Sequence, residues 1–152
     1  MSLYPNYIPP HPKHPSSFDF QVVDAGEIGK ALLTLRPWRR GDFMARFDGV
    51  TVPTVYQHTL QKTPSVHLLD VHFIGMLAHA CDPNIMLDME QQEMYALKDI
   101  AEGSILSMDY AATEDHLFQT FACGCGAPNC RGWITGRKQA VPAPFQCLAP
   151  VV

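Results

Sequence analysis

Two cysteine clusters, about forty residues apart, constrain this chain more than any other feature of its sequence. The first holds Cys81, and the second holds Cys123, Cys125 and Cys130. Four thiolates are what a closed structural zinc site uses. If Cys81 joins the other three, the metal pins the C-terminal segment onto the middle of the chain. Such a staple would close a pocket around Tyr110, which lies between the two clusters.

The chain has 152 residues, enough for one compact domain. Hydrophobic residues make up 47% of it and charged residues 17%, which is a globular composition. No apolar run approaches the roughly 20 residues that a membrane-spanning helix needs, and no secretory signal is recognisable. We therefore expect an intracellular protein, cytoplasmic or nuclear, with no membrane partner. In a reducing compartment, metal ligation explains the clustered cysteines better than disulfides do, and Cys147 is left as an unpaired tail thiol.

A formal net charge of −4 argues against duplex nucleic acid as the main partner, because such proteins usually carry a basic surface. Basic residues gather locally only around Trp38, at Arg36, Arg39, Arg40 and Arg46. A stretch of this kind is more often a solvated turn and strand face than a phosphate-binding patch. The sequence thus carries no strong nucleic-acid signal, and it does not indicate an oligomeric state.

Short strands dominate the part of the chain between about residues 18 and 136. Patterns of apolar and polar residues predict them at Phe18–Val23, Phe43–Val52, Asn84–Met89, Met94–Leu97 and Ser104–Met108. Only Val66–Leu77 has the apolar spacing of a helix, and Gly75 limits it. Residues 1–15 contain five prolines, which favour an extended arm that is mobile or lies on the surface.

Four stretches of the sequence, in the right order, resemble the SET domain of protein lysine methyltransferases with its cysteine-rich post-SET extension. They are an opening glycine motif with its hairpin, a His-to-Asn signature, a strand pair ending in Asp-Tyr, and the Cys-x-Cys-x4-Cys-Arg-Gly segment: Gly29–Phe43, His79–Asn84, Ala96–Tyr110 and Cys123–Ile134. The resemblance implies a mainly β fold of small curled sheets with short helices and a C-terminal zinc segment. It divides the chain into a proline-rich arm, a SET domain, a post-SET zinc segment and a tail, at 1–17, 18–119, 120–136 and 137–152.

The resemblance also implies a role for individual residues. Tyr110 would be catalytic, and Met108 would lie in the substrate pocket and help to set how many methyl groups are added. The cofactor S-adenosylmethionine would contact Gly29, Lys30, Ala31, Ala78, His79, Trp133 and Ile134. Structural Zn²⁺ would be held by Cys81, Cys123, Cys125 and Cys130.

The implied function is methyl transfer from S-adenosylmethionine to an amine, most simply a lysine of a protein or peptide, with a histone among the candidates. A small-molecule amine fits the sequence as well. The alternative is a degenerate SET-fold protein that binds a partner or small molecule without methylating lysine. Ala78, in place of the family's signature asparagine, and Ala31, in place of its second glycine, favour this alternative. Read singly, Tyr110 would be half-buried sheet packing and His79 a satisfied core histidine.

Overall fold

The structure is a computed structural model, and it describes residues 1–143. The chain there forms short β-strands joined by turns, with three 3₁₀ segments: η1 (Gly26–Ile28), η2 (Ile74–Met76) and η3 (Tyr110–Ala112). The strands are β1 (Phe20–Asp24), β2 (Lys30–Thr34), β3 (Phe43–Arg46), β4 (Val50–Val52), β5 (Thr59–Thr63), β6 (Val66–Leu69), β7 (Ala78–His79), β8 (Ile85–Asp88), β9 (Glu93–Ala96), β10 (Ser107–Met108), β11 (Phe121–Ala122) and β12 (Trp133–Ile134). The expected mainly β fold is confirmed.

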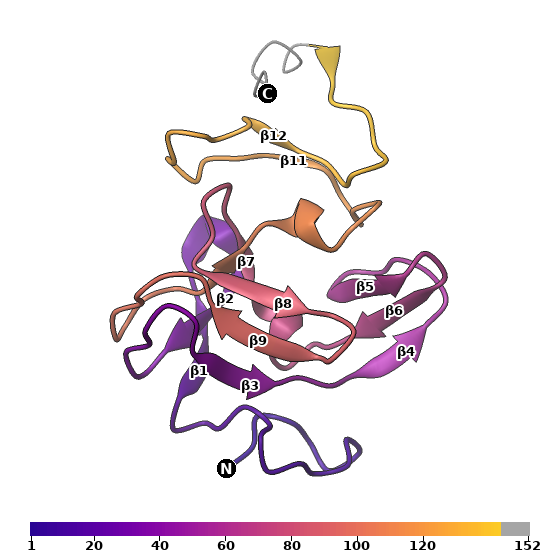
Figure 1. The fold of residues 1–152 in the computed structure, drawn as a ribbon. Coiled ribbons are helices and arrows are strands. Elements are labelled where there is room, and N and C mark those ends of the chain that lie inside the picture. Colours follow the sequence, from indigo (N-terminus) through magenta and orange to yellow (C-terminus); the bar gives the residue numbers. More distant parts are fainter. Residues whose placement is uncertain (144–152) are drawn as a thin grey trace.

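The strands combine into small separate sheets rather than one large one (Figure 1). Two sheets have three strands, in the orders β3-β9-β8 and β4-β6-β5, and all their pairs are antiparallel. The pairs β1-β2 and β11-β12 are antiparallel hairpin-like ladders, whereas β7 and β10 pair in parallel. The parallel pair is important for function because it joins two segments that are distant in the sequence.

The core lies where these sheets meet, around the fully buried rings of Phe20, Phe47 and Phe73. Phe20 stacks on Trp38 with 5.7 Å between ring centroids and meets Phe73 edge to face at 5.0 Å. Burying an apolar side chain of this size contributes about 1.5–3 kcal/mol relative to leaving it exposed. Trp38 donates its indole N–H to the Thr34 hydroxyl at 2.7 Å, so its polar atom is satisfied inside the core.

The predicted helix over Val66–Leu77 was wrong. Val66–Leu69 is instead β6, the central strand of its sheet, and only Ile74–Met76 turns as a 3₁₀ segment. Asp70 ends the strand because its carboxylate accepts the backbone N–H groups of residues 72, 73 and 74, at 2.8–3.0 Å. A Cβ on Gly75 would lie 1.9 Å from the Asp70 carbonyl oxygen, so the turn folds back too tightly for any other residue. Local hydrogen bonds to Asp70 thus override the helix-like apolar spacing.

The proline-rich N-terminal arm packs on the core, beneath β3 in Figure 1. Tyr4 and Ile8 are both buried. The Tyr4 hydroxyl donates to Oδ2 of Asp70 at 2.7 Å and accepts the N–H of Asp48 at 2.8 Å. Sequence patterns missed this docking because proline density reports local stiffness and not tertiary contact.

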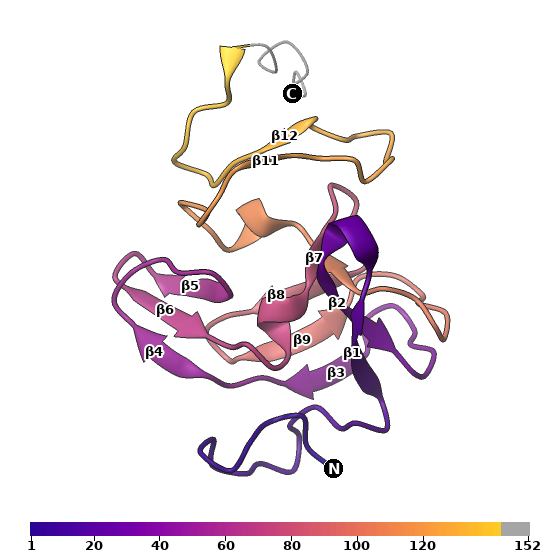
Figure 2. The same ribbon diagram turned by 180° about the vertical axis from the view of Figure 1, so that it is seen from behind.

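The β11-β12 pair lies at the opposite end of the molecule from the arm, as both views show (Figures 1 and 2). The segment that follows it returns to the β core: the N–H groups of Arg137 and Lys138 donate to the carbonyls of Glu114 and Asp115, both at 2.9 Å. No helix within residues 1–143 is long and apolar enough to cross a membrane. Cys147 lies outside the described residues.

Candidate functional site

A cavity of about 900 Å³ is lined by residues of the β core and of β11. Its walls include six of the residues that the sequence indicated for cofactor, substrate or catalysis: Gly29, Lys30, Ala78, His79, Met108 and Tyr110. Ala31, Trp133 and Ile134 do not line it. Ala31 and Ile134 are fully buried. The cavity is lined instead by Phe121 and Ala122 of β11, which pair with Ile134 and Trp133 of β12.

The parallel pairing of β7 with β10 brings the two motifs together. Ala78 lies opposite Ser107 and His79 opposite Met108, so residues about thirty positions apart become neighbours. The ladder continues at Ala80, whose N–H donates to the Met108 carbonyl at 3.0 Å. The chain leaves β10 through Asp109 and turns at once into η3, which begins with Tyr110.

The Tyr110 hydroxyl donates to the carbonyl oxygen of Leu77 at 2.6 Å. Burial raises the pKa of Tyr110 to about 12, so the phenol is protonated at neutral pH. Because the hydroxyl proton is committed to Leu77, the lone pairs of the oxygen are left to accept a hydrogen bond. Tyr110 therefore presents an acceptor at the cavity wall.

His79 is neutral and holds the backbone of Tyr110. Burial lowers the pKa of His79 to about 4, although the Asp109 carboxylate opposes this. Its Nδ1 accepts the N–H of Tyr110 at 3.1 Å, which assigns the ring proton to Nε2. Nδ1 lies 3.9 Å from Oδ1 of Asp109, but with a neutral ring this contact is not an ion pair.

Three aromatic rings that line the cavity contact one another. The ring of His79 lies 5.1 Å from that of Tyr110, and Phe121 lies 5.8 and 5.9 Å from the two, all edge to face. Sequence reasoning missed Phe121, because a two-residue strand gives no periodic signal. It also missed Tyr56 and Glu114, which line the cavity from segments without a recognisable motif.

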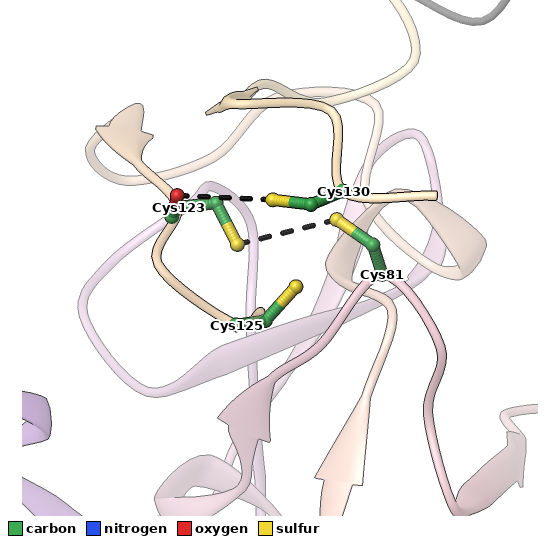
Figure 3. A group of neighbouring side chains, drawn as sticks. All are labelled: Cys81, Cys123, Cys125 and Cys130. Atoms are coloured by element: carbon green, nitrogen blue, oxygen red, sulfur yellow. Dashed lines mark hydrogen bonds between the residues drawn. The ribbon is translucent and has the colours of Figure 1, made fainter. Parts of the chain in front are cut away.

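The four predicted cysteines form one cluster, with all four sulfur atoms within 4.8 Å of one another (Figure 3). The Sγ atoms of Cys81 and Cys123 are 4.0 Å apart, close to the roughly 3.8 Å expected between thiolates around one tetrahedral Zn²⁺ with Zn–S bonds of about 2.3 Å. A backbone hydrogen bond from Cys81 lowers the pKa of Cys125 to about 6, whereas burial raises the pKa of Cys81 and of Cys123. The donor set and its spacing fit structural zinc.

The cysteine cluster is tied to the cavity by two neighbouring side chains of the C-terminal segment. Asn129 donates its amide to the Cys81 carbonyl at 3.0 Å. Arg131 donates its backbone N–H to the Cys81 sulfur at 3.4 Å, and its guanidinium holds Asp109, the residue before Tyr110. Arg131 therefore connects the cysteine cluster to the segment that carries Tyr110.

The cavity also fits a cofactor of the size of S-adenosylmethionine, since sites for such ligands are typically 300–1,000 Å³. Gly29 lines it with a φ of 85° and a Cβ position that meets no atom within 4 Å. A glycine there leaves backbone groups accessible to a ligand. Phe121 and Tyr110 provide aromatic faces, which attract a cationic group such as a sulfonium.

Comparisons with known proteins find relatives in sequence and in fold. No family model matches the chain. A methyltransferase of Aspergillus flavus, flvH, is 28% identical over 91 residues, which are 59% of this chain and 51% of that protein. An H3 lysine-4 specific histone-lysine N-methyltransferase of Eremothecium gossypii is 37% identical over 65 residues, 37% of this chain and 6% of that protein. The chain thus spans about half of one relative and a small part of the other.

Solved structures show the same fold. KRYPTONITE in complex with mCHG DNA and SAH superposes with a TM-score of 0.63 at 22% identity, over 75% of this chain and 28% of that one. The methyltransferase domain of human histone-lysine N-methyltransferase SETMAR gives a TM-score of 0.60 at 20% identity, over 77% and 58% of the two chains.

Proposed function

We propose that this chain, which has the fold of SET-domain methyltransferases and is related to them in sequence, transfers a methyl group from S-adenosylmethionine to an amine. A lysine side chain of a protein or peptide is the simplest acceptor, in line with the histone-lysine specificity in the name of one relative. The observation that carries the proposal is the pairing of β7 with β10. This pairing brings Tyr110 next to the end of β7, where its hydroxyl donates to the Leu77 carbonyl. Both residues line a cavity that adjoins the four cysteines.

The cavity walls would keep the acceptor amine neutral. A free lysine has a pKa of about 10.4, and only its neutral form has the lone pair that a nucleophile needs. Leu77 and Met108 are buried apolar residues in the cavity wall. Desolvation beside such groups disfavours the ammonium and lowers the amine pKa.

Tyr110 would orient that amine. Its oxygen can accept an amine N–H because its own proton is held by Leu77. An amine anchored in this way keeps its lone pair free and pointing into the cavity. Bound S-adenosylmethionine supplies an activated methyl group on a sulfonium, so positioning by the protein provides most of the catalysis. His79 would act as a positioning residue, because it holds the Tyr110 backbone through Nδ1.

Zinc would be structural, with all four positions taken by Cys81, Cys123, Cys125 and Cys130. A closed set of four thiolates leaves no open position for substrate, so the metal would hold the C-terminal segment over the cavity. Trp133 and Ile134 follow the last cysteine of this segment but do not line the cavity, and their contact with the cofactor stays a prediction. A reduced cysteine cluster fits an intracellular location, cytoplasmic or nuclear, which is also part of the proposal.

The test combines cofactor titration with turnover. Calorimetric titration of the purified protein with S-adenosylmethionine should show saturable binding, and incubation with labelled cofactor and lysine-bearing acceptors should label an amine. Ala78→Asn restores a polar side chain at the cavity wall and should tighten the cofactor. Binding without any transfer would favour a degenerate SET-fold protein. No binding to either protein would remove the methyltransferase proposal.

A further inference from the structure

The edge of β5 beside the cavity is already occupied by the chain itself. β5 is an outer strand of its sheet, and Thr59 and Leu60 line the cavity. A free sheet edge would offer its N–H and C=O groups to an extended peptide. Here the N–H of Gln61 donates to Oε2 of Glu114 at 2.8 Å, and that of Thr59 donates to the Tyr56 carbonyl at 3.3 Å.

A second pair of hydrogen bonds reinforces this closure through the Gln61 side chain. Its Nε2 donates to Oδ2 of Asp115 at 2.8 Å, and its Oε1 accepts the Asp115 N–H at 2.9 Å. Glu114 also accepts the hydroxyl proton of Thr113 at 2.7 Å. Gln61 and Glu114 are each only 6% exposed, so these bonds are shielded from water. We call residues 113–117 the closing segment.

The closing segment is fastened on its other side as well. Arg137 and Lys138 donate backbone N–H groups to the Glu114 and Asp115 carbonyls, and the Leu117 N–H donates to the Gln139 side chain at 2.9 Å. A Cβ on Gly136 would lie 2.2 Å from the Asp115 carbonyl oxygen, so the two segments touch without a gap. The closing segment is therefore held between β5 and residues 136–139.

We propose that Glu114 is a specificity-determining residue: it closes the β5 edge, so that the acceptor is recognised through its amine-bearing side chain and not by strand pairing. The inference rests on the proposed methyl transfer and narrows its substrate class to lysines that enter the cavity without an extended backbone along β5. Glu114 lines the same cavity as Tyr110 and Met108, so an entering side chain can reach the tyrosine while the edge stays closed.

The experiment compares two acceptors that share one lysine. Nα-acetyl-lysine methylamide carries the side chain with almost no backbone, and a ten-residue extended peptide adds strand-forming residues on both sides. In the wild type, kcat/KM for the two should agree within about threefold. In Glu114→Ala the peptide should gain at least about tenfold over the short acceptor, because the Gln61 N–H becomes available to the peptide backbone. Glu102→Ala, at an exposed glutamate outside the cavity wall, is the matched control and should leave the ratio unchanged.

A wild type that already prefers the peptide tenfold, or an unchanged ratio in Glu114→Ala, overturns the inference. If Glu114→Ala does not fold, Glu114→Gln keeps an acceptor oxygen and should retain the wild-type ratio. Amide hydrogen exchange decides the closure without turnover: the Gln61 N–H should be protected in the wild type, and rapid exchange there sinks the idea. If the wild type methylates neither acceptor, the proposed function fails, whereas a protected Gln61 still supports the closed edge.

Discussion

The Arg131 guanidinium donates two parallel hydrogen bonds to the Asp109 carboxylate, from Nη1 to Oδ2 at 2.8 Å and from Nη2 to Oδ1 at 2.7 Å. Asp109 caps η3 by accepting the Ala111 N–H at 3.0 Å, and η3 begins with Tyr110. Arg131 directly follows Cys130. One ion pair therefore links the cysteine cluster to the turn that presents the tyrosine.

Breaking this ion pair should destabilise the fold by about 1 kcal/mol, since both side chains are only about a quarter exposed and the geometry is bidentate. Burial raises the pKa of Asp109, but Arg131 outweighs it and leaves that pKa below its usual value. A double-mutant cycle with Arg131→Gln and Asp109→Asn, each of which removes one charge, followed by urea denaturation, measures the coupling. The more exposed pair Lys98–Asp82 is the control and should show almost none. Strictly additive effects at Arg131 and Asp109 would contradict the link.

Purified protein should contain about one zinc per chain, bound by the four clustered thiolates. Cys81→Ser should lower the zinc content, measured by elemental analysis, whereas Cys147→Ser should not. Chelation should weaken cofactor binding before it unfolds the β core, because the metal holds the segment over the cavity. A fully folded, metal-free protein with undiminished cofactor affinity would remove the zinc assignment.

Tyr110→Phe should cut turnover about a hundredfold or more, as expected for the loss of roughly 2–4 kcal/mol from an oriented catalytic group. The substitution keeps the ring and removes one hydrogen bond, to Leu77, so the free energy of unfolding should fall by only about 1 kcal/mol. Cofactor affinity should be nearly intact. Turnover, melting temperature and cofactor titration are compared side by side, and full activity in the variant excludes Tyr110 from the chemistry.

The pH profile of turnover should rise with the deprotonation of the acceptor amine and show no other inflection between about pH 6 and 10. His79 has a pKa of about 4 because burial lowers it, so it stays neutral across this range. Tyr110, whose pKa burial raises to about 12, stays protonated. Zinc content is measured at each pH as the control. An inflection near pH 6.5, the ordinary value for histidine, that persists in a variant with His58→Gln, the other histidine of the cavity wall, would mean that His79 titrates during turnover.

Tyr4→Phe should destabilise the protein by about 1–3 kcal/mol, because it removes hydrogen bonds to the Asp70 carboxylate and from the Asp48 N–H inside the core. Tyr7→Phe is a matched control, since the Tyr7 hydroxyl bonds His72 on the exposed surface. Thermal denaturation compares the two. Equal stability of Tyr4→Phe and the wild type would mean that the hydrogen bonds of the Tyr4 hydroxyl do not stabilise the fold.

The sequence predicted the parts of the site that depend on residue chemistry and motif spacing. Four cysteines with ligand spacing indicated the cluster, and the family resemblance assigned His79 and Tyr110 to one cofactor and substrate site. The docking of Tyr4 and the contacts of Glu114 depend on side chains brought together by tertiary structure, and no local pattern reports them. The helix predicted over Val66–Leu77 failed for a related reason: apolar spacing cannot reveal that Asp70 takes three backbone N–H groups.

The parallel pair of β7 and β10 also joins segments that are synthesised about thirty residues apart, so the site is completed late in synthesis. Both three-stranded sheets are complete in sequence by Ala96. The cavity needs Tyr110, then Phe121 and the last cysteine at 130, and the closing segment is fastened only by residues up to 139. During synthesis, all residues of both three-stranded sheets therefore leave the ribosome before the core residues Leu106 and Met108 and before the cavity is complete. A break in the chain after β9 would leave a fragment without β10, β11 and β12, and so without Tyr110 and three of the four clustered cysteines.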